Sequence, residues 1–136
     1  MWKKPFAYFI NLLFLINCSV SHKTFTEQEV ILKKLSIEKY GTTFQLMYNT
    51  EKSYSAVVKQ EKVTSQNPNP GLQFFIFDME EEKIVFEDNI AMGKINWENN
   101  DKIEVIVTPG MISTEDNNKI HGYIYNVKLK TKTDIN

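Results

Sequence analysis

The stretch Leu72-Gln73-Phe74-Phe75-Ile76-Phe77-Asp78-Met79 is the clearest indication of the fold. Successive side chains of a β-strand point to opposite faces of its sheet, so the run Phe74-Phe75-Ile76-Phe77 is apolar on both faces. One of those faces must therefore meet something beyond a single core. A strand of a two-layer β-sandwich would explain this pattern. The alternative is an exposed apolar patch that meets a partner.

Turn-rich clusters divide the rest of the chain into short segments in which apolar and polar residues alternate. The acidic turn at 80–82 and the turn Asn99-Asn100-Asp101 each predict a hairpin. Six or seven such strands predict an all-β fold, either an antiparallel β-sandwich or a small β-barrel. The predicted strands are 42–48, 54–63, 72–79, 83–88, 94–98, 102–108 and 120–130.

The aromatic residues of these strands are the best candidates for a binding surface. In the last predicted strand, Tyr123 and Tyr125 share a face with Val127 and Leu129, which indicates one buried and one solvated side. Together with Phe75 and Phe77, the two tyrosines are the candidate surface for stacking against a sugar or a peptide. Trp97 is expected in the core.

Two patterns compete in the segment that follows the polar residues 19–29. Thr26 and Glu29 have the spacing of a helix capping box in front of an apolar run. Leu35 and Ile37 alternate with Ser36 and Glu38, which is typical of a strand. The alternation favours a strand here, although a short helix is the other reading.

The first 23 residues have the three-part layout of an export signal. Lys3 and Lys4 precede a mainly apolar segment at 6–16, and small polar residues follow it. That segment is too short to cross a bilayer, which takes roughly 20 residues, and a signal core is the usual role of a run of about 10–14. No later apolar run approaches a spanning length.

The end of this segment, Leu15-Ile16-Asn17-Cys18, resembles the signal of bacterial lipoproteins. The resemblance implies cleavage between Asn17 and Cys18, a diacylglycerol on the Cys18 sulfur and an acyl chain on its amine. More than one chain is needed for stable anchoring, and this modification would supply it. By the same resemblance, Ser19 directly after the cysteine implies anchoring in the outer membrane, facing the periplasm. The expected division is a signal peptide at 1–17, a lipidated N-terminus and flexible tether at 18–29, a single β-domain at 30–131 and a C-terminal tail at 132–136.

A second cleavage site remains open. Ser19-Val20-Ser21 is a small-x-small triplet, so cleavage after Ser21 would remove the cysteine and give a secreted or periplasmic soluble protein. Cys18 is the only cysteine, and an unpaired thiol is a liability in an oxidising compartment. Lipidation and removal both resolve that problem, but the position of Cys18 favours lipidation.

Composition excludes several classes of function. Removal of residues 1–17 leaves 119 residues with 14 lysines and 17 acids, a formal charge of −3, and every basic residue is lysine. This is not the balance of a nucleic-acid-binding protein. The histidines, His22 and His121, have no nucleophile motif near them, and the Cys/His clusters that bind zinc are missing.

The acidic residues give no catalytic or metal site either. Glu87 and Asp88 are neighbours on a predicted strand, so they would point to opposite faces and not converge as a glycosidase pair. The oxygen-rich stretches 78–82 and 115–118 lack the spacing of known calcium loops. We therefore expect no enzyme activity, no metal and no cofactor.

The expected function is that of a lipid-anchored envelope protein. It would be a non-enzymatic binding or accessory module, held at the membrane through its lipid, with an unidentified envelope protein or glycan as its partner. The alternative is a small inhibitor or immunity protein directed against an enzyme that attacks the envelope.

Overall fold

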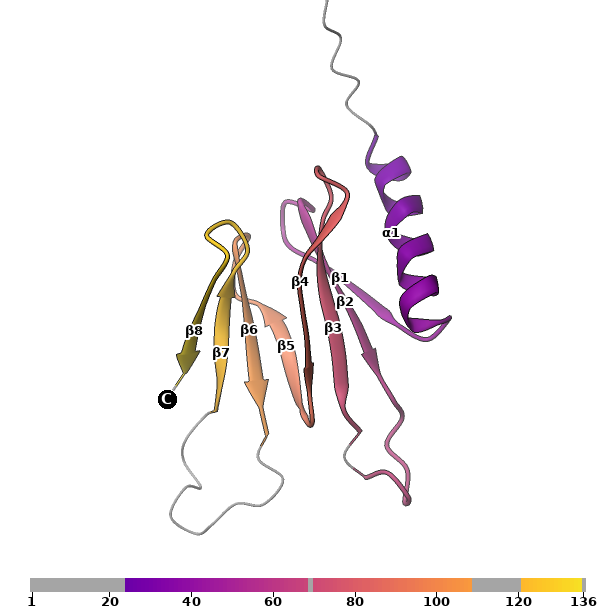
Figure 1. Ribbon diagram of the computed structural model, residues 1–136, viewed down its shortest axis with the longest axis vertical. Helices are drawn as coiled ribbons and strands as arrows, with labels where there is room; N and C mark the ends of the chain where they lie inside the picture. The colour runs from indigo at the N-terminus through magenta and orange to yellow at the C-terminus, as the bar shows by residue number, and fades with distance from the viewer. Residues whose placement is uncertain (1–23, 69, 109–120, 136) are drawn as a thin grey trace, which may run out of the picture.

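Two four-stranded antiparallel sheets and one helix make up the part of the chain that the computed structural model describes, residues 24–68, 70–108 and 121–135 (Figure 1). The first sheet has the strand order β1-β2-β3-β4 and the second has the order β5-β6-β7-β8. The elements are α1 (Phe25–Tyr40), β1 (Gln45–Tyr48), β2 (Tyr54–Gln60), β3 (Leu72–Asp78), β4 (Lys83–Ile90), β5 (Gly93–Trp97), β6 (Lys102–Val107), β7 (His121–Asn126) and β8 (Thr131–Ile135).

The architecture is sandwich-like and not a closed barrel, which confirms the predicted antiparallel β-sandwich in its coarse form. Both predicted hairpins are present, β3–β4 and β5–β6. The strands number eight within the described residues, where six or seven were expected. The additional one is β8, and four of its five residues, 132–135, were expected in a C-terminal tail.

The strand expected around Leu35 and Ile37 is wrong, because this segment belongs to α1. The capping box lies two residues earlier than expected, with Thr24 as the N-cap. The Thr24 backbone N–H donates to Glu27 Oε2 at 2.8 Å, and the Thr24 side chain accepts from the Glu27 N–H. Gly41, with φ of 75°, ends the helix. Residues 25–29, expected in a flexible tether, are therefore the first turns of α1.

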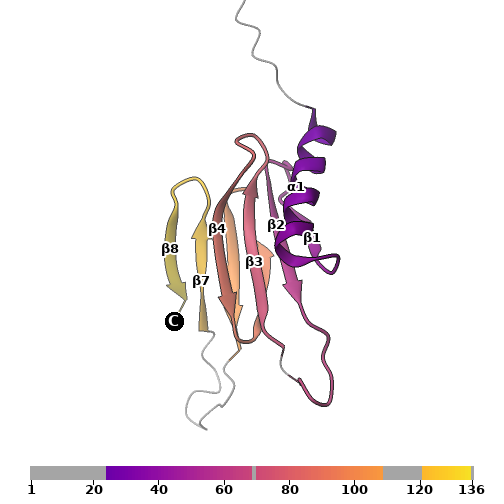
Figure 2. The same ribbon diagram turned by 45° about the vertical axis from the view of Figure 1, so that its right-hand side comes forward.

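The first sheet is the middle layer of the molecule, which accounts for the doubly apolar β3. Phe74 and Ile76 point into the inter-sheet core between the two sheets. Phe75 and Phe77 point the other way, into a helix-side core that also contains Leu32 of α1. All four β3 side chains have no exposed surface. Figure 2 shows α1 along one side of this sheet and the second sheet on the other.

A β-bulge in β4 decides which of its side chains face the helix. The register of β3 with β4 shifts between Ile76 and Phe77, opposite Val85. As a result Val85 and Phe86 both pack on the inter-sheet core, and Phe86 stacks on Tyr125 at 3.9 Å between ring centroids. The alternation then resumes one residue out of phase, which places Glu87 on the side of α1.

Asn49 ties the turns of the two sheets together. Its buried side chain donates to the Asn100 carbonyl at 2.8 Å and to Ser53 Oγ at 2.9 Å, and it accepts from the Tyr54 N–H at 3.0 Å. Asn100 in turn accepts from the Glu51 N–H. The β1–β2 turn and the β5–β6 turn are therefore joined by a satisfied polar network at one end of the sandwich.

Candidate functional site

The four aromatic side chains expected on a binding surface are buried. Phe75 and Phe77 are completely inaccessible, and Tyr123 and Tyr125 are only 4% and 5% exposed. The two phenylalanines lie under α1, and the two tyrosines lie between the sheets. They hold the layers together and do not form one exposed surface.

Trp97 of β5 connects the two sheets through a hydrogen bond to Met47 of β1. Its ring packs on the inter-sheet core, and its Nε1–H donates to the Met47 carbonyl at 2.7 Å. Tyr54 lies beside it, with ring centroids 6.5 Å apart. The side chain that was expected in the core is thus partly buried at its edge.

Glu87 and Asp88 point to opposite faces, as predicted. Glu87 forms an ion pair with Lys39 of α1 at 2.9 Å. Asp88 accepts from the Tyr123 hydroxyl at 2.5 Å on the side of the second sheet, and Lys132 lies over the Tyr123 ring. Burial, the hydrogen bond and the negative charge of Asp88 together raise the pKa of Tyr123. This pair of acids therefore contributes to packing on two sides of β4.

The remaining sequence candidates form no site within the described residues. His121 is an exposed first residue of β7. In the turn at 78–82, Asp78 accepts the N–H groups of Glu80 and Glu81, so its carboxylate stabilises the turn. No group of three or more His, Cys, Asp or Glu side chains able to hold a metal ion occurs in the described ranges. Asn17, Cys18 and the stretch 115–118 lie outside those ranges.

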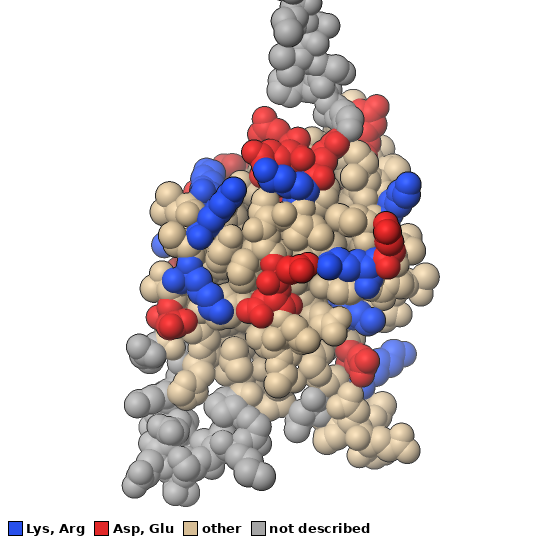
Figure 3. Space-filling view, viewed as in Figure 1, with Lys and Arg blue, Asp and Glu red and all other residues tan. Residues whose placement is uncertain are grey.

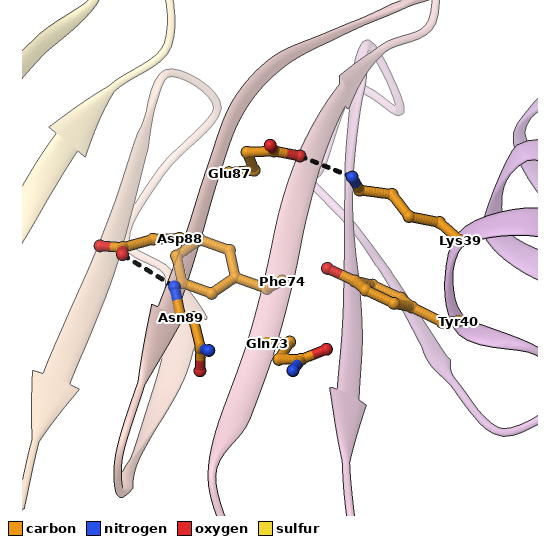
Figure 4. A pocket seen from close by; sticks show the side chains of 7 residues that line it. All are labelled: Lys39, Tyr40, Gln73, Phe74, Glu87, Asp88 and Asn89. Carbon is orange, nitrogen blue, oxygen red and sulfur yellow. Dashed lines mark hydrogen bonds and ion pairs between the residues drawn. The ribbon is translucent and has the colours of Figure 1, made fainter.

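The best candidate site is a depression of about 300 Å³ between the end of α1 and the first sheet (Figure 4). We call it the helix-edge groove. Lys39 and Tyr40 come from the last turn of α1, Gln73 from β3, and Glu87 and Asn89 from β4. Because α1 ends at Tyr40, this end of the sheet carries polar side chains on the face that the helix covers elsewhere.

A second depression of about 240 Å³ continues the groove along the same face. Its lining includes Lys59, Glu61 and Gly71, and it shares Gln73 and Asn89 with the first depression. In Figure 3, acidic and basic side chains lie next to one another across the middle of the face that carries the groove. The charged residues of the lining are Lys39, Lys59, Glu61, Glu87 and Asp88. The Asp88 carboxylate is engaged by Tyr123 on the side of the second sheet, which leaves two lysines and two glutamates on the groove side.

Tyr40 is the aromatic side chain of the groove. Its ring lies 5.4 Å from that of Phe75, which supports it from the helix-side core, and Lys59 Nζ lies 6.0 Å from its centroid. Burial, with a smaller effect of the Glu87 charge, raises the pKa of Tyr40 to about 12. Tyr40 is therefore a neutral hydrogen-bonding group over the whole physiological pH range.

The raised tyrosine pKa values predict that the fold is lost at alkaline pH. Burial is the largest cause for all five described tyrosines, Tyr40, Tyr48, Tyr54, Tyr123 and Tyr125. A pKa that is higher in the folded state than the unfolded value of about 10 gives a contribution to stability that is complete below pH ~10 and falls above it. An absorbance titration of tyrosinate should show little ionisation near pH 10 and a cooperative rise together with loss of circular dichroism at higher pH.

The same titration in denaturant is the control, and there the tyrosines should ionise near pH 10, their ordinary pKa. Ionisation of all five tyrosines near pH 10 with the circular dichroism unchanged would contradict the burial on which this prediction rests.

Sequence reasoning missed the groove because its walls come from distant segments. The available signal was weak: Gln73 interrupts the apolar face that Phe75 and Phe77 of β3 turn toward α1, and Asn89 of β4 pairs with it. Neither residue indicates a site until the end of α1 is placed beside it.

Comparisons with known proteins add no relative. The chain has no significant match to a protein-family model, to a curated protein or to a solved structure. Among the described residues, no helix combines the length and apolarity needed to cross a membrane.

Proposed function

We propose that this chain is an exported lipoprotein of the bacterial cell envelope that acts as a non-enzymatic binding module. The observation that carries the proposal is the position of Cys18, the only cysteine, directly after a short apolar segment that follows two lysines. The lipidated protein would be held at the outer membrane and face the periplasm. The helix-edge groove would receive its partner, a glycan or another envelope protein.

The groove supports binding better than catalysis. Within the described residues, its lining contains no histidine, cysteine or serine, and so it lacks an imidazole base and a nucleophile of the usual kinds. Lys39 and Glu87 are paired with one another and partly exposed. What the lining does contain is an aromatic ring, two amides and balanced charges, which suit recognition of a neutral polar ligand.

The distance from the anchor to the folded domain also fits this role. Residues 19–24 separate Cys18 from the start of α1. Six residues span at most about 20 Å. A lipid on Cys18 would therefore keep the domain close to the membrane surface and raise the effective concentration of any partner confined there.

Mass spectrometry of the mature N-terminus tests the anchor. We expect a chain that starts at Cys18 and carries three acyl chains, found with the outer membrane after fractionation. The variant Cys18→Ser should lose the lipid and leave the membrane fraction, whereas Ser21→Ala should change neither result. A mature chain that starts at His22 without lipid would contradict the anchor.

Photo-crosslinking tests the binding surface. A photoreactive residue at Gln73, in the groove, should capture a specific envelope component, while the same residue at exposed Thr133 of β8 should not. Equal capture at both positions, or none at either, would count against the groove as the binding surface. Capture of an envelope-degrading enzyme at Gln73 alone would instead favour the inhibitor alternative.

A further inference from the structure

Two side-chain amides without a hydrogen-bond partner among the described residues lie side by side in the groove. Gln73 and Asn89 are partners in the β3–β4 register, so their side chains project from the same face. Directly paired residues place their Cβ atoms about 4.5–5.5 Å apart. Neither side-chain amide has a hydrogen-bond partner within the part of the chain that the structure describes, and both residues are exposed. Each amide offers donors and an acceptor in one plane, which matches the paired donor and acceptor character of hydroxyl groups.

The charges around these amides leave no excess of positive charge, which argues against a polyanionic ligand. Lys39 and Glu87 neutralise one another across the groove, and Lys59 and Glu61 provide one further charge of each sign. The chain contains no arginine, the residue that best recognises phosphate and carboxylate groups in bidentate fashion. A phosphorylated or polyanionic ligand would find no positive field here.

Tyr40 supplies an aromatic ring beside the two amides. Phe75 supports its ring from below, and no described residue is hydrogen-bonded to its hydroxyl. A tyrosine with a supported ring and an available hydroxyl can contact the C–H groups of a ligand and donate to one of its oxygens. This combination suits a ligand that has both C–H surfaces and hydroxyl groups.

The size of the groove favours a small ligand over a protein. Its larger part, of about 300 Å³, is at the lower end of the ~300–1,000 Å³ range that is typical of small-molecule sites, and the adjoining part has about 240 Å³. A standard protein interface buries about 800 Å² on each partner around an apolar centre. The helix-edge groove is polar at its centre, where the two amides lie, and so it does not have that anatomy.

We infer that the helix-edge groove binds a neutral saccharide. Gln73 and Asn89 exchange hydrogen bonds with adjacent hydroxyl groups of a sugar ring, and Tyr40 contacts its C–H surface. This inference rests on the proposed function, because it uses the same groove. It identifies the partner as a glycan and not as a protein.

Saccharide titrations of the purified full-length mature protein, in a detergent without sugar groups, test the inference. The neutral probes are tetrasaccharides of N-acetylglucosamine, of β-linked glucose and of α-linked glucose. The charged probes are a sulfated tetrasaccharide and inorganic phosphate. Saturation-transfer NMR should detect at least one neutral probe and neither charged probe, and calorimetry should then give its affinity.

Matched variants connect the binding to the groove. The double variant Gln73→Ala/Asn89→Ala should weaken the neutral probe by at least about tenfold, because two hydrogen-bonding groups are lost. Gln60→Ala/Asn96→Ala removes the same two residue types from exposed positions outside the groove and should leave the affinity unchanged. Since all four side chains are exposed, thermal unfolding should show that both variants remain folded.

Three results would overturn the inference: no neutral probe binds at millimolar concentration, a charged probe binds more tightly, or the groove variant binds as the wild type does. Failure here is distinguishable from failure of the proposed function. If crosslinking at Gln73 captures an envelope protein but no saccharide binds, the binding module stands and its ligand is not a sugar. If a saccharide binds but the mature chain lacks lipid, the groove stands without the anchor.

Discussion

Replacement of Phe75 by alanine should lower the free energy of unfolding by roughly 3–5 kcal/mol, the usual cost of truncating a large buried aromatic side chain. Phe75 is completely buried between the first sheet and α1, and its ring also supports Tyr40. The truncation removes apolar burial and leaves a cavity in the helix-side core. Urea unfolding followed by circular dichroism would measure the change.

The control for this variant is Leu129→Ala. Leu129 is 71% exposed, and truncation at such a site should change the free energy of unfolding by no more than about 0.5 kcal/mol. If Phe75→Ala were as mild as Leu129→Ala, Phe75 would not be buried under the helix. The result therefore separates the observed core position from the exposed binding patch that the sequence also allowed.

Replacement of Gly122 by alanine should cost about 3 kcal/mol or more, or prevent folding. A Cβ atom at this position would lie 2.0 Å from the Val105 carbonyl oxygen and 3.1 Å from the Ile106 Cα. Both obstacles are backbone atoms of the neighbouring strand β6, so no side chain can rotate to relieve the clash. The strands β6 and β7 would have to separate locally, with loss of their ladder hydrogen bonds.

Gly71→Ala is the matched control for this prediction. A Cβ atom on Gly71 would meet its nearest neighbour, the Ile90 carbonyl oxygen, at 3.5 Å, which is ordinary contact. We expect a change within about 1 kcal/mol. Limited proteolysis of both variants during expression provides a second measurement for the case in which Gly122→Ala does not accumulate. A Gly122→Ala chain as stable and as protease-resistant as Gly71→Ala would contradict the close approach of β6 and β7.

The strands were predictable because hairpins are local. Alternation of apolar and polar residues and the turns between them located β3, β4, β5 and β6 from neighbouring residues alone. β8 was missed because four of its five residues are exposed, and an edge strand of that kind carries no apolar alternation.

The helix was missed because α1 is barely amphipathic. Val30 and Ile37 are exposed on its outer side, and Ser36 is buried against the sheet, where its hydroxyl donates to the Leu32 carbonyl. Because of these residues, the apolar side chains do not recur with the period of an amphipathic helix, and Leu35 and Ile37 alternate with polar residues as they would in a strand. Only contacts with the sheet, formed by residues distant in sequence, distinguish the two structures.

The helix-edge groove depends on two further features that no local pattern encodes. The bulge at Val85 turns Glu87 toward α1, and the end of the helix at Gly41 leaves Gln73 and Asn89 uncovered. A single-residue shift in either would change the groove without altering the strands. Candidate sites built from the ends and irregularities of elements are therefore harder to predict than the elements themselves.

Every strand in both sheets pairs only with strands adjacent to it in the chain. Each sheet can therefore form from one continuous stretch of the chain, and only the packing of the layers on one another joins distant residues. During synthesis, residues 25–90, which form α1 and the first sheet, are complete before the strands of the second sheet leave the ribosome. The helix face of β3 can then be covered before the second sheet is available, which shortens the time during which Phe75 and Phe77 are accessible.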